Sequence, residues 1–405
     1  MKRACTMTKQ QTTVATALFI ISVIFIAMTL RTPLTAVGPV IPLIRDDLGI
    51  SNVLAGFLTT IPLLAFAIIS PFVARIARKF SIERTLFFAL LLIASGIVLR
   101  AFTDINGILL GTFFIGVAIA FGNVLMPSYM KLRMPLKVGV MMAVYSMSMN
   151  ISASMAAGIS FPIAETSWSW RGSLSFALIF VIAAIIIWLP QLKQKASMHA
   201  PTTSRSLPLS KSLLAWAIAA MMGIQSLLFY STSSWVPDIL ATQGFSASEA
   251  GWLSSLMLIA QLPMTFIVPM LASRKSMHMP ITISFCASYM LGFIVLYFGW
   301  TSLAPLSMIC IGLAGGASFS LVMMLFTMRT ESIYTSAELS GFAQSTGYLL
   351  AAIGPITFGW LHDVTNSWSA TIFAFMLCTI VILISGLYAS RNKTIEQSFD
   401  SKHTC

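Results

Sequence analysis

Twelve long apolar runs constrain this chain more than any other feature of its sequence. Most of them reach the ~20 residues that an α-helix needs to cross a ~30 Å hydrocarbon core. The runs are continuously apolar and do not alternate, which argues against the strands of a membrane β-barrel. We therefore predict an all-α membrane protein with twelve transmembrane helices, at about residues 14–42, 52–73, 84–102, 107–130, 137–164, 172–189, 213–235, 247–272, 280–298, 303–328, 338–361 and 367–389.

The positive charge of the chain is distributed as expected for membrane loops. Only 9% of the residues are charged and the net charge is +12, whereas about 25% are charged in a soluble domain. When the spans are threaded from a cytoplasmic N-terminus, twenty of the 24 Lys and Arg fall on the cytoplasmic side and three on the other, with Arg31 inside the first span. Because cytoplasmic loops carry an excess of Lys and Arg, we predict a bacterial inner-membrane protein with both termini in the cytoplasm, and no nucleic-acid partner.

An internal repeat divides the chain into two similar parts. At a constant offset of 195, the residues Pro42, Gly49, Ser51, Ala55, Gly56 and Leu58 recur as Pro237, Gly244, Ser246, Ala250, Gly251 and Leu253. The polar, basic stretch 191–211 between the parts, which contains Pro201 and Pro208, is typical of a linker. We predict a six-helix half at 1–190, a cytoplasmic linker at 191–211 and a second six-helix half at 212–405.

Several motifs resemble one family of transporters. Two parallel six-helix halves are typical of the major facilitator superfamily. The stretches 30–33 (Leu-Arg-Thr-Pro), 122–127 (Gly-Asn-Val-Leu-Met-Pro), 225–230, 235–237 and 343–355 resemble its cyanate permease and 2-nitroimidazole transporter branch. The loop after the second span keeps the basic residues of the superfamily motif but lacks its aspartate. The resemblance implies the major facilitator fold and secondary transport by alternating access, without a cofactor.

Arg31 is the first candidate for the binding site. It lies about seventeen residues into the first predicted span, where an arginine costs roughly 2.5–3.5 kcal/mol on insertion scales. All twelve Asp and Glu fall in loops or at span ends, so an anionic ligand could compensate this charge. The alternative is a structural arginine that caps carbonyls near Pro33. Thr35 follows four residues later on the same helical face.

Other polar residues within the spans complete the candidate set. In the first half, Asn123 and Tyr145 could orient a solute, although Asn123 is equally explained by a hydrogen bond between helices. In the second half the candidates are Gln225, Tyr230, Gln261, Gln344 and Tyr348. Gln344 and Tyr348 are four residues apart, so a helix would present their amide and phenol on one face.

These residues favour secondary transport of a small polar solute, such as a cyanate-like anion or a nitro-heterocycle, by a monomer in the lipid bilayer. The alternatives are an exporter of drugs or toxic compounds and, more distantly, a membrane receptor that does not transport. The sequence leaves the coupling ion open, a proton included. We expect no enzyme, no cofactor and no metal site, because no Ser/His/Asp set, phosphate loop or metal-ligand spacing is found.

Overall fold

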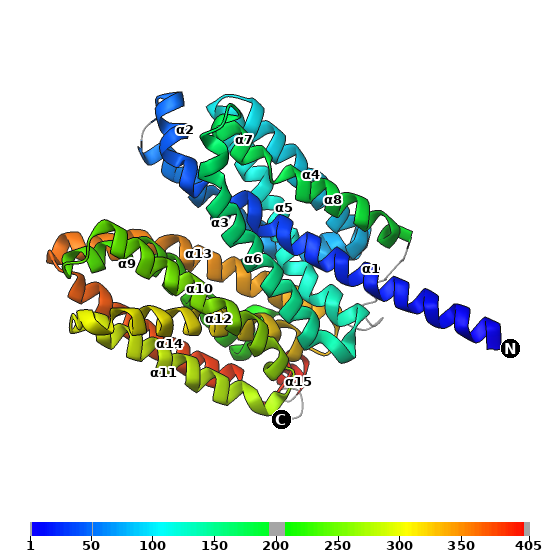
Figure 1. The fold of residues 1–405 in the computed structure, drawn as a ribbon. Coiled ribbons are helices and arrows are strands. Elements are labelled where there is room, and N and C mark those ends of the chain that lie inside the picture. Colours follow the sequence, from blue (N-terminus) through cyan, green and yellow to red (C-terminus); the bar gives the residue numbers. More distant parts are fainter. Residues whose placement is uncertain (1, 51, 194–206, 401–405) are drawn as a thin grey trace. The chain divides into compact units, whose positions relative to one another are not determined.

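The computed structural model describes residues 2–50, 52–193 and 207–400, which form helices and their connections without a β-strand (Figure 1). The linker prediction falls partly on residues 194–206, outside the described residues. The α-helices are α1 (Lys2–Thr35), α2 (Ile41–Leu48), α3 (Asn52–Phe80), α4 (Ile82–Phe102), α5 (Ile105–Arg133), α6 (Val138–Ala164), α7 (Ser169–Ser175), α8 (Leu178–Trp188), α9 (Leu213–Thr242), α10 (Ala247–Ala272), α11 (His278–Tyr297), α12 (Ala304–Met328), α13 (Ile333–Thr365), α14 (Trp368–Ala389) and α15 (Ile395–Asp400). Short 3₁₀ turns η1 (Gly38–Val40), η2 (Pro135–Lys137), η3 (Leu189–Lys193), η4 (Leu209–Lys211), η5 (Lys275–Met277) and η6 (Thr301–Leu303) join some of them.

The helices confirm the predicted fold class. Eleven of the segments in the described part of the chain are long and apolar enough to cross a membrane. The twelfth predicted span, 338–361, lies within α13, which has 33 residues but is not among these eleven. The sixth predicted span is broken into α7 and α8 by a turn at Phe176 and Ala177. The predicted all-α fold with twelve membrane helices agrees with these eleven segments taken together with the long helix α13.

Serine side chains set the first residue of several helices. Ser212, Ser246, Ser332 and Ser367 are the N-caps of α9, α10, α13 and α14, and each accepts a hydrogen bond from a backbone N–H of the first turn. Ser246 also forms a capping box with Glu249. Because the first N–H groups of a helix have no partner within it, such caps fix where the helix begins.

The repeat seen in the sequence produces the same turn twice. Gly49 ends α2 with φ of 61°, and Gly244 follows α9 with φ of 95°. Both values lie in the region that favours glycine. Ser246, the N-cap of α10, is the counterpart of residue 51 in the repeat. Residue 51 lies outside the described residues.

The chain forms two compact units that are interleaved in sequence. Unit 1 contains residues 1–65, 75–126 and 144–198, and unit 2 contains residues 66–74, 127–143 and 199–405. The division into halves at 1–190 and 212–405 stays a prediction.

In unit 2, glycines allow the closest helix contacts. α9 packs along α13, and α10 packs along α12 (Figure 1). An added Cβ at Gly347 would lie 3.3 Å from the Cα of Gly223, so α9 and α13 meet backbone to backbone there. An added Cβ at Gly316 would lie 3.0 Å from the Cα of Gln261, and Gly312 meets the backbone of Met257 in the same way. The spacing of Gly312 and Gly316 in the sequence is typical of close helix approach, and the structure shows that contact.

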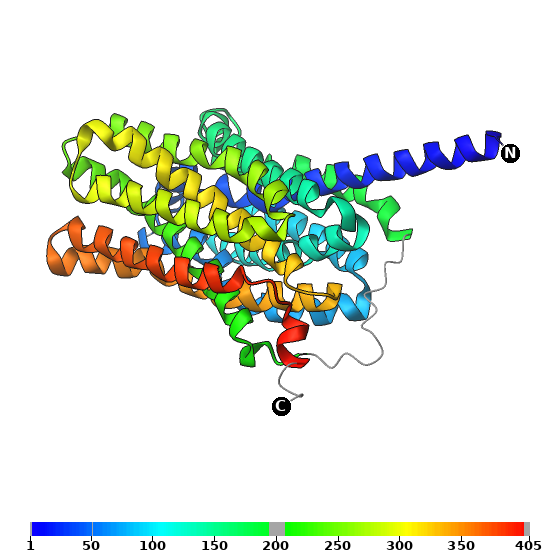
Figure 2. The same cartoon turned by 90° about the horizontal axis from the view of Figure 1, so that it is seen from below.

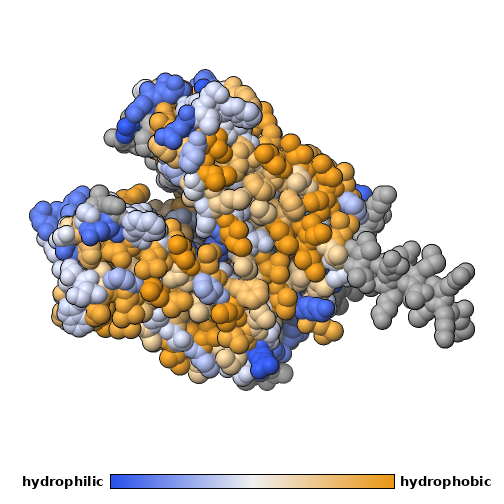
Figure 3. Space-filling view, viewed as in Figure 1, coloured by the Kyte–Doolittle hydropathy of each residue, from blue (hydrophilic) through white to orange (hydrophobic). Residues whose placement is uncertain are grey.

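The surface of the units carries apolar side chains between polar ends. Figure 3 shows hydrophobic residues over the sides of the helices and hydrophilic residues gathered at their ends. Large apolar side chains such as Phe88, Ile179 and Ile384 are more than 60% exposed. Such a surface suits lipid contact, since only a hydrocarbon solvent accepts so much exposed apolar area without cost.

Candidate functional site

Unit 1 holds four of the predicted site residues, and Arg31 is the charged one. It is the sole charged residue of the candidate span Thr16–Val40. Its side chain is partly buried, and its carbonyl oxygen accepts a hydrogen bond from the hydroxyl of Thr35 at 3.1 Å. Pro33 lies between them within α1 and removes one backbone donor from the helix. Arg31 and Thr35 therefore lie on one turn of α1, in which Pro33 donates no backbone hydrogen bond.

A close contact joins the segments of α1 and α5 that contain Arg31 and Asn123. An added Cβ at Gly122 would lie 2.9 Å from Cδ1 of Leu30 and closer still to Cδ2. Leu30 and Gly122 directly precede Arg31 and Asn123 in the sequence. The segments of α1 and α5 that carry Arg31 and Asn123 therefore pack against one another within unit 1, through the side chain of Leu30.

Asn123 and Tyr145 are joined by a hydrogen bond. The hydroxyl of Tyr145 on α6 donates to Oδ1 of Asn123 on α5 at 3.4 Å, and both side chains are buried. The sequence suggested both residues without pairing them. The hydrogen bond fixes the orientation of the phenol and of the amide. Each group can therefore meet a solute in only a limited range of directions.

Unit 2 holds the other five residues, and four of them lie on α9 and α13. Gln225 donates to Oγ of Ser226 at 2.6 Å, and Gln344 donates to Oγ of Ser340 at 2.8 Å. Both amides are buried. The ring of Tyr348 is 4.9 Å from that of Phe66, an aromatic pair within unit 2 that the sequence did not indicate.

Gln261 and Tyr230 differ in their surroundings. Gln261 lines a small cavity of about 10 Å³ inside unit 2, together with Thr232 and Tyr289. Phe229 lines this cavity, whereas Tyr230 stacks edge to face on Phe229 at 5.3 Å between ring centroids and is not among the lining residues. The structure therefore brings Gln261, but not Tyr230, to this cavity.

A buried network at one end of unit 2 was missed by the sequence analysis. Arg329, just after α12, donates to the carbonyls of Ala389 and Ser390 at 2.8 Å each, and its Nη2 lies 2.6 Å from Nδ1 of His278. His278 Nε2 lies 2.7 Å from the carbonyl of Ala272. Burial lowers the pKa of Arg329 to about 10, so it stays charged near neutral pH. The network joins the ends of α10, α11, α12 and α14 and is structural. A basic residue directly after an apolar run was its only signal in the sequence.

Arg100 is a second missed residue. It lies near the end of α4 and is 1% exposed, although the charge count assigned it to the non-cytoplasmic side of the membrane. Its three guanidinium nitrogens have no hydrogen-bond partner among the described residues. Arg100 is thus more deeply buried than Arg31, which is only partly buried.

Comparison with known proteins identifies the family. Residues 17–355 match the profile of the Major Facilitator Superfamily. The chain belongs to the Major Facilitator Superfamily. It is a multi-pass membrane transporter, as the sequence predicted.

Curated relatives cover nearly the whole chain. An uncharacterized transporter of Bacillus subtilis, YycB, is 40% identical over 94% of this chain and 95% of its own length. The 2-nitroimidazole transporter of Escherichia coli is 35% identical over 93% and 96%, and the cyanate transport protein CynX of the same organism is 24% identical over 89% and 94%. The resemblance to the cyanate permease and 2-nitroimidazole transporter branch is confirmed.

Solved structures agree on the fold. The proton:xylose symporter XylE, bound to 6-bromo-6-deoxy-D-glucose, superposes with a TM-score of 0.76 at 15% identity, covering 96% of this chain and 99% of the symporter. At this identity the likeness concerns the fold alone.

Proposed function

We propose that this protein is a secondary transporter of a small polar solute, either a compact anion or a nitro-heterocycle, that works by alternating access in the bacterial inner membrane. Both termini would lie in the cytoplasm, in agreement with the charge pattern. A relative that is 35% identical over 93% of the chain is named a 2-nitroimidazole transporter, which supports the solute class.

One observation carries the proposal. Arg31, the sole charge of its span, directly follows Leu30, whose side chain packs on Gly122 of α5. The next residue of α5, Asn123, accepts the hydrogen bond of Tyr145. A guanidinium presents several N–H donors in a planar fork, which suits the oxygen pair of a carboxylate or nitro group. Linear cyanate would accept through one terminal atom. Amides and phenols such as those of Gln344 and Tyr348 would then orient the solute. The few polar side chains favour a compact solute over a sugar, which needs many hydrogen bonds.

Binding to purified protein tests this assignment. Ligand that binds only the folded protein raises its apparent stability by RT ln(1 + [L]/Kd). We expect 2-nitroimidazole or cyanate to raise the melting temperature of the wild type. Arg31→Lys keeps the charge but loses the planar fork, and should bind more weakly than wild type. Arg31→Gln should lose most of the binding.

Arg84→Gln is the matched control. Arg84 also belongs to unit 1 but is exposed at the start of α4, so its removal should leave binding unchanged. Normal binding by a folded Arg31→Gln would show that Arg31 is structural, and the proposed solute contact would be wrong.

A further inference from the structure

A basic cavity lies at one end of unit 2, and none of the nine predicted site residues lines it. It has a volume of about 180 Å³, far above the ~10–15 Å³ that a single water needs. The chain before and at the start of α9, the end of α14 and α15 line it. Figure 2 shows the start of α9 next to α15, near the C-terminal end of the chain.

Every charged residue that lines this cavity is basic. Lys211 precedes α9, and Arg391 and Lys393 follow α14. Two acids on neighbouring elements bond to other groups. Glu396 on α15 accepts from the backbone N–H groups of residues 331 and 332, and Glu331 accepts from the side chains of residues 394 and 397. No acid is among the described residues that line the cavity, so the three cations give it a positive potential.

Further groups in the cavity suit an anion with several oxygens. The guanidinium of Arg391 lies over the ring of Tyr388, with its Cζ 4.6 Å from the centroid, which holds it at the cavity wall. The hydroxyl of Ser398 belongs to the lining. Leu213 and Leu214, the first residues of the 30-residue helix α9, line it as well. Their N–H groups have no acceptor within the helix and add positive potential.

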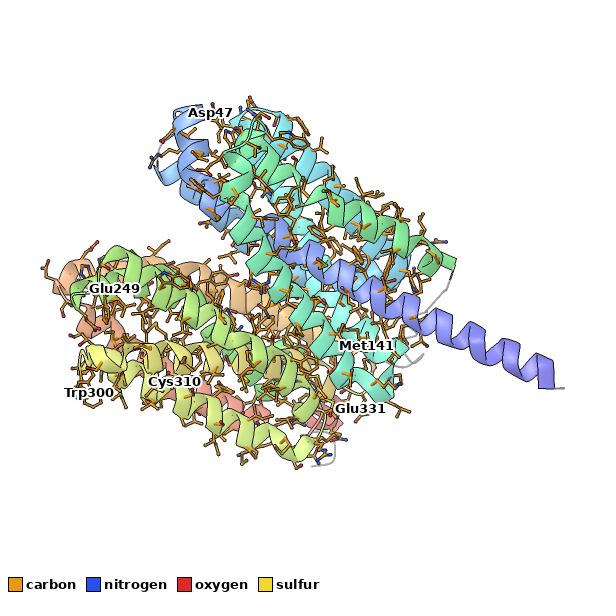
Figure 4. All side chains as sticks on the ribbon, in the orientation of Figure 1. Asp47, Met141, Glu249, Trp300, Cys310 and Glu331 are labelled. Atoms are coloured by element: carbon orange, nitrogen blue, oxygen red, sulfur yellow. The ribbon has the colours of Figure 1, made fainter. Side chains whose placement is uncertain are left out.

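The rim of the cavity is suited to lipid. Leu213 is 66% exposed, and Trp216, one turn further along α9, is 45% exposed. The indole N–H of Trp216 donates to the carbonyl of Ser210 at 2.8 Å. A tryptophan with an exposed ring and a bonded N–H at a helix end is typical of the membrane–water interface. Figure 4 places Glu331 and Glu249 at opposite ends of unit 2, and the bonds of Glu331 to α15 put the cavity at the Glu331 end.

We propose that this cavity binds the phosphate group of an anionic phospholipid from the cytoplasmic leaflet. The charge pattern assigns this end of the chain to the cytoplasm, where anionic lipids concentrate and basic pockets hold their headgroups. Soluble phosphate esters carry the same group and could bind the same cations. The apolar, exposed rim favours a phosphate that carries acyl chains. The proposal does not depend on the transported solute, and its test needs no transport.

Thermal unfolding of the full chain in detergent, with lipid added, tests the proposal. Phosphatidylglycerol should raise the melting temperature, and zwitterionic phosphatidylethanolamine should not. In the double variant Lys211→Gln/Arg391→Gln, the affinity for phosphatidylglycerol should fall roughly thirtyfold, as expected from two basic contacts. Ser398→Glu, which adds a negative charge and removes no cation, should weaken the response in the same direction.

Arg274→Gln/Lys275→Gln is the matched control, because it removes two exposed cations of unit 2 that do not line the cavity. It should respond to phosphatidylglycerol like the wild type. Equal responses of the control and cavity variants, or equal stabilisation by the two lipids, would overturn the proposal. Full stabilisation by inorganic phosphate, with no further effect of phosphatidylglycerol, would assign the cavity to soluble phosphates and overturn the lipid assignment.

Discussion

Replacing Gly316 by alanine should separate two helices of unit 2. An added Cβ would lie 3.0 Å from both Cα and the carbonyl carbon of Gln261, and closer still to the carbonyl oxygen. Carbon atoms pack best at about 3.5–4.0 Å. Because the obstacle is backbone and not the end of a side chain, α12 and α10 must move apart.

The neighbouring Gly315 provides a control for the helix effect of alanine. An added Cβ there would lie 3.5 Å from the hydroxyl of Tyr289, an ordinary contact. Both variants gain up to about 1 kcal/mol of helix propensity, so their difference isolates the overpacking. Overpacking of this kind costs about 1–3 kcal/mol, which is a factor of about 5 to 150 in the unfolding equilibrium.

The assay is reversible unfolding in mixed micelles, followed by tryptophan fluorescence. We expect Gly316→Ala to be less stable than Gly315→Ala by about 1–3 kcal/mol, and to bind solute more weakly because Gln261 moves with α10. Equal stability of the two variants would refute the inference that α10 and α12 touch at Gly316.

Three further predictions concern different parts of the chain. Arg329→Ala should lower the melting temperature strongly, because each buried partner left unpaired costs about 1–3 kcal/mol; a melting temperature like that of the wild type would show that the network adds no stability. A cysteine at Ala200 should react with an impermeant reagent only from the cytoplasm, and one at Asp46 only from outside; labelling from the same side would contradict the twelve-span topology. If transport is coupled to protons, Glu249→Gln and Glu338→Gln should each keep a pH-dependent uptake, since neither acid lies at a span centre; loss of that dependence in one folded variant would identify it as the proton carrier.

The sequence predicted those features that depend on one helix or on a fixed offset. The apolar runs located the spans, and the offset of 195 located the two glycines that both adopt positive φ, Gly49 and Gly244. The spacing of Gly312 and Gly316 is typical of close helix approach, and both glycines meet the backbone of α10. Each of these follows from local geometry, which a single stretch of sequence contains.

Features that combine several helices could not be predicted. The bond between Tyr145 and Asn123 depends on how α5 and α6 are rotated about their axes, which helical periodicity alone does not determine. The Arg329–His278 network needs the ends of four helices in one place. The burial of Arg100 was missed for the same reason, since charge counting assigns a residue to a side of the membrane and not to a protein interior.

Solute exchange by the purified protein in liposomes tests the central claim most directly. Proteoliposomes preloaded with unlabelled 2-nitroimidazole or cyanate should take up the labelled compound faster than protein-free liposomes, and Arg31→Gln should abolish the difference while Arg84→Gln keeps it. A wild-type protein that binds the compound but exchanges it no faster than empty liposomes would be a receptor and would contradict the account.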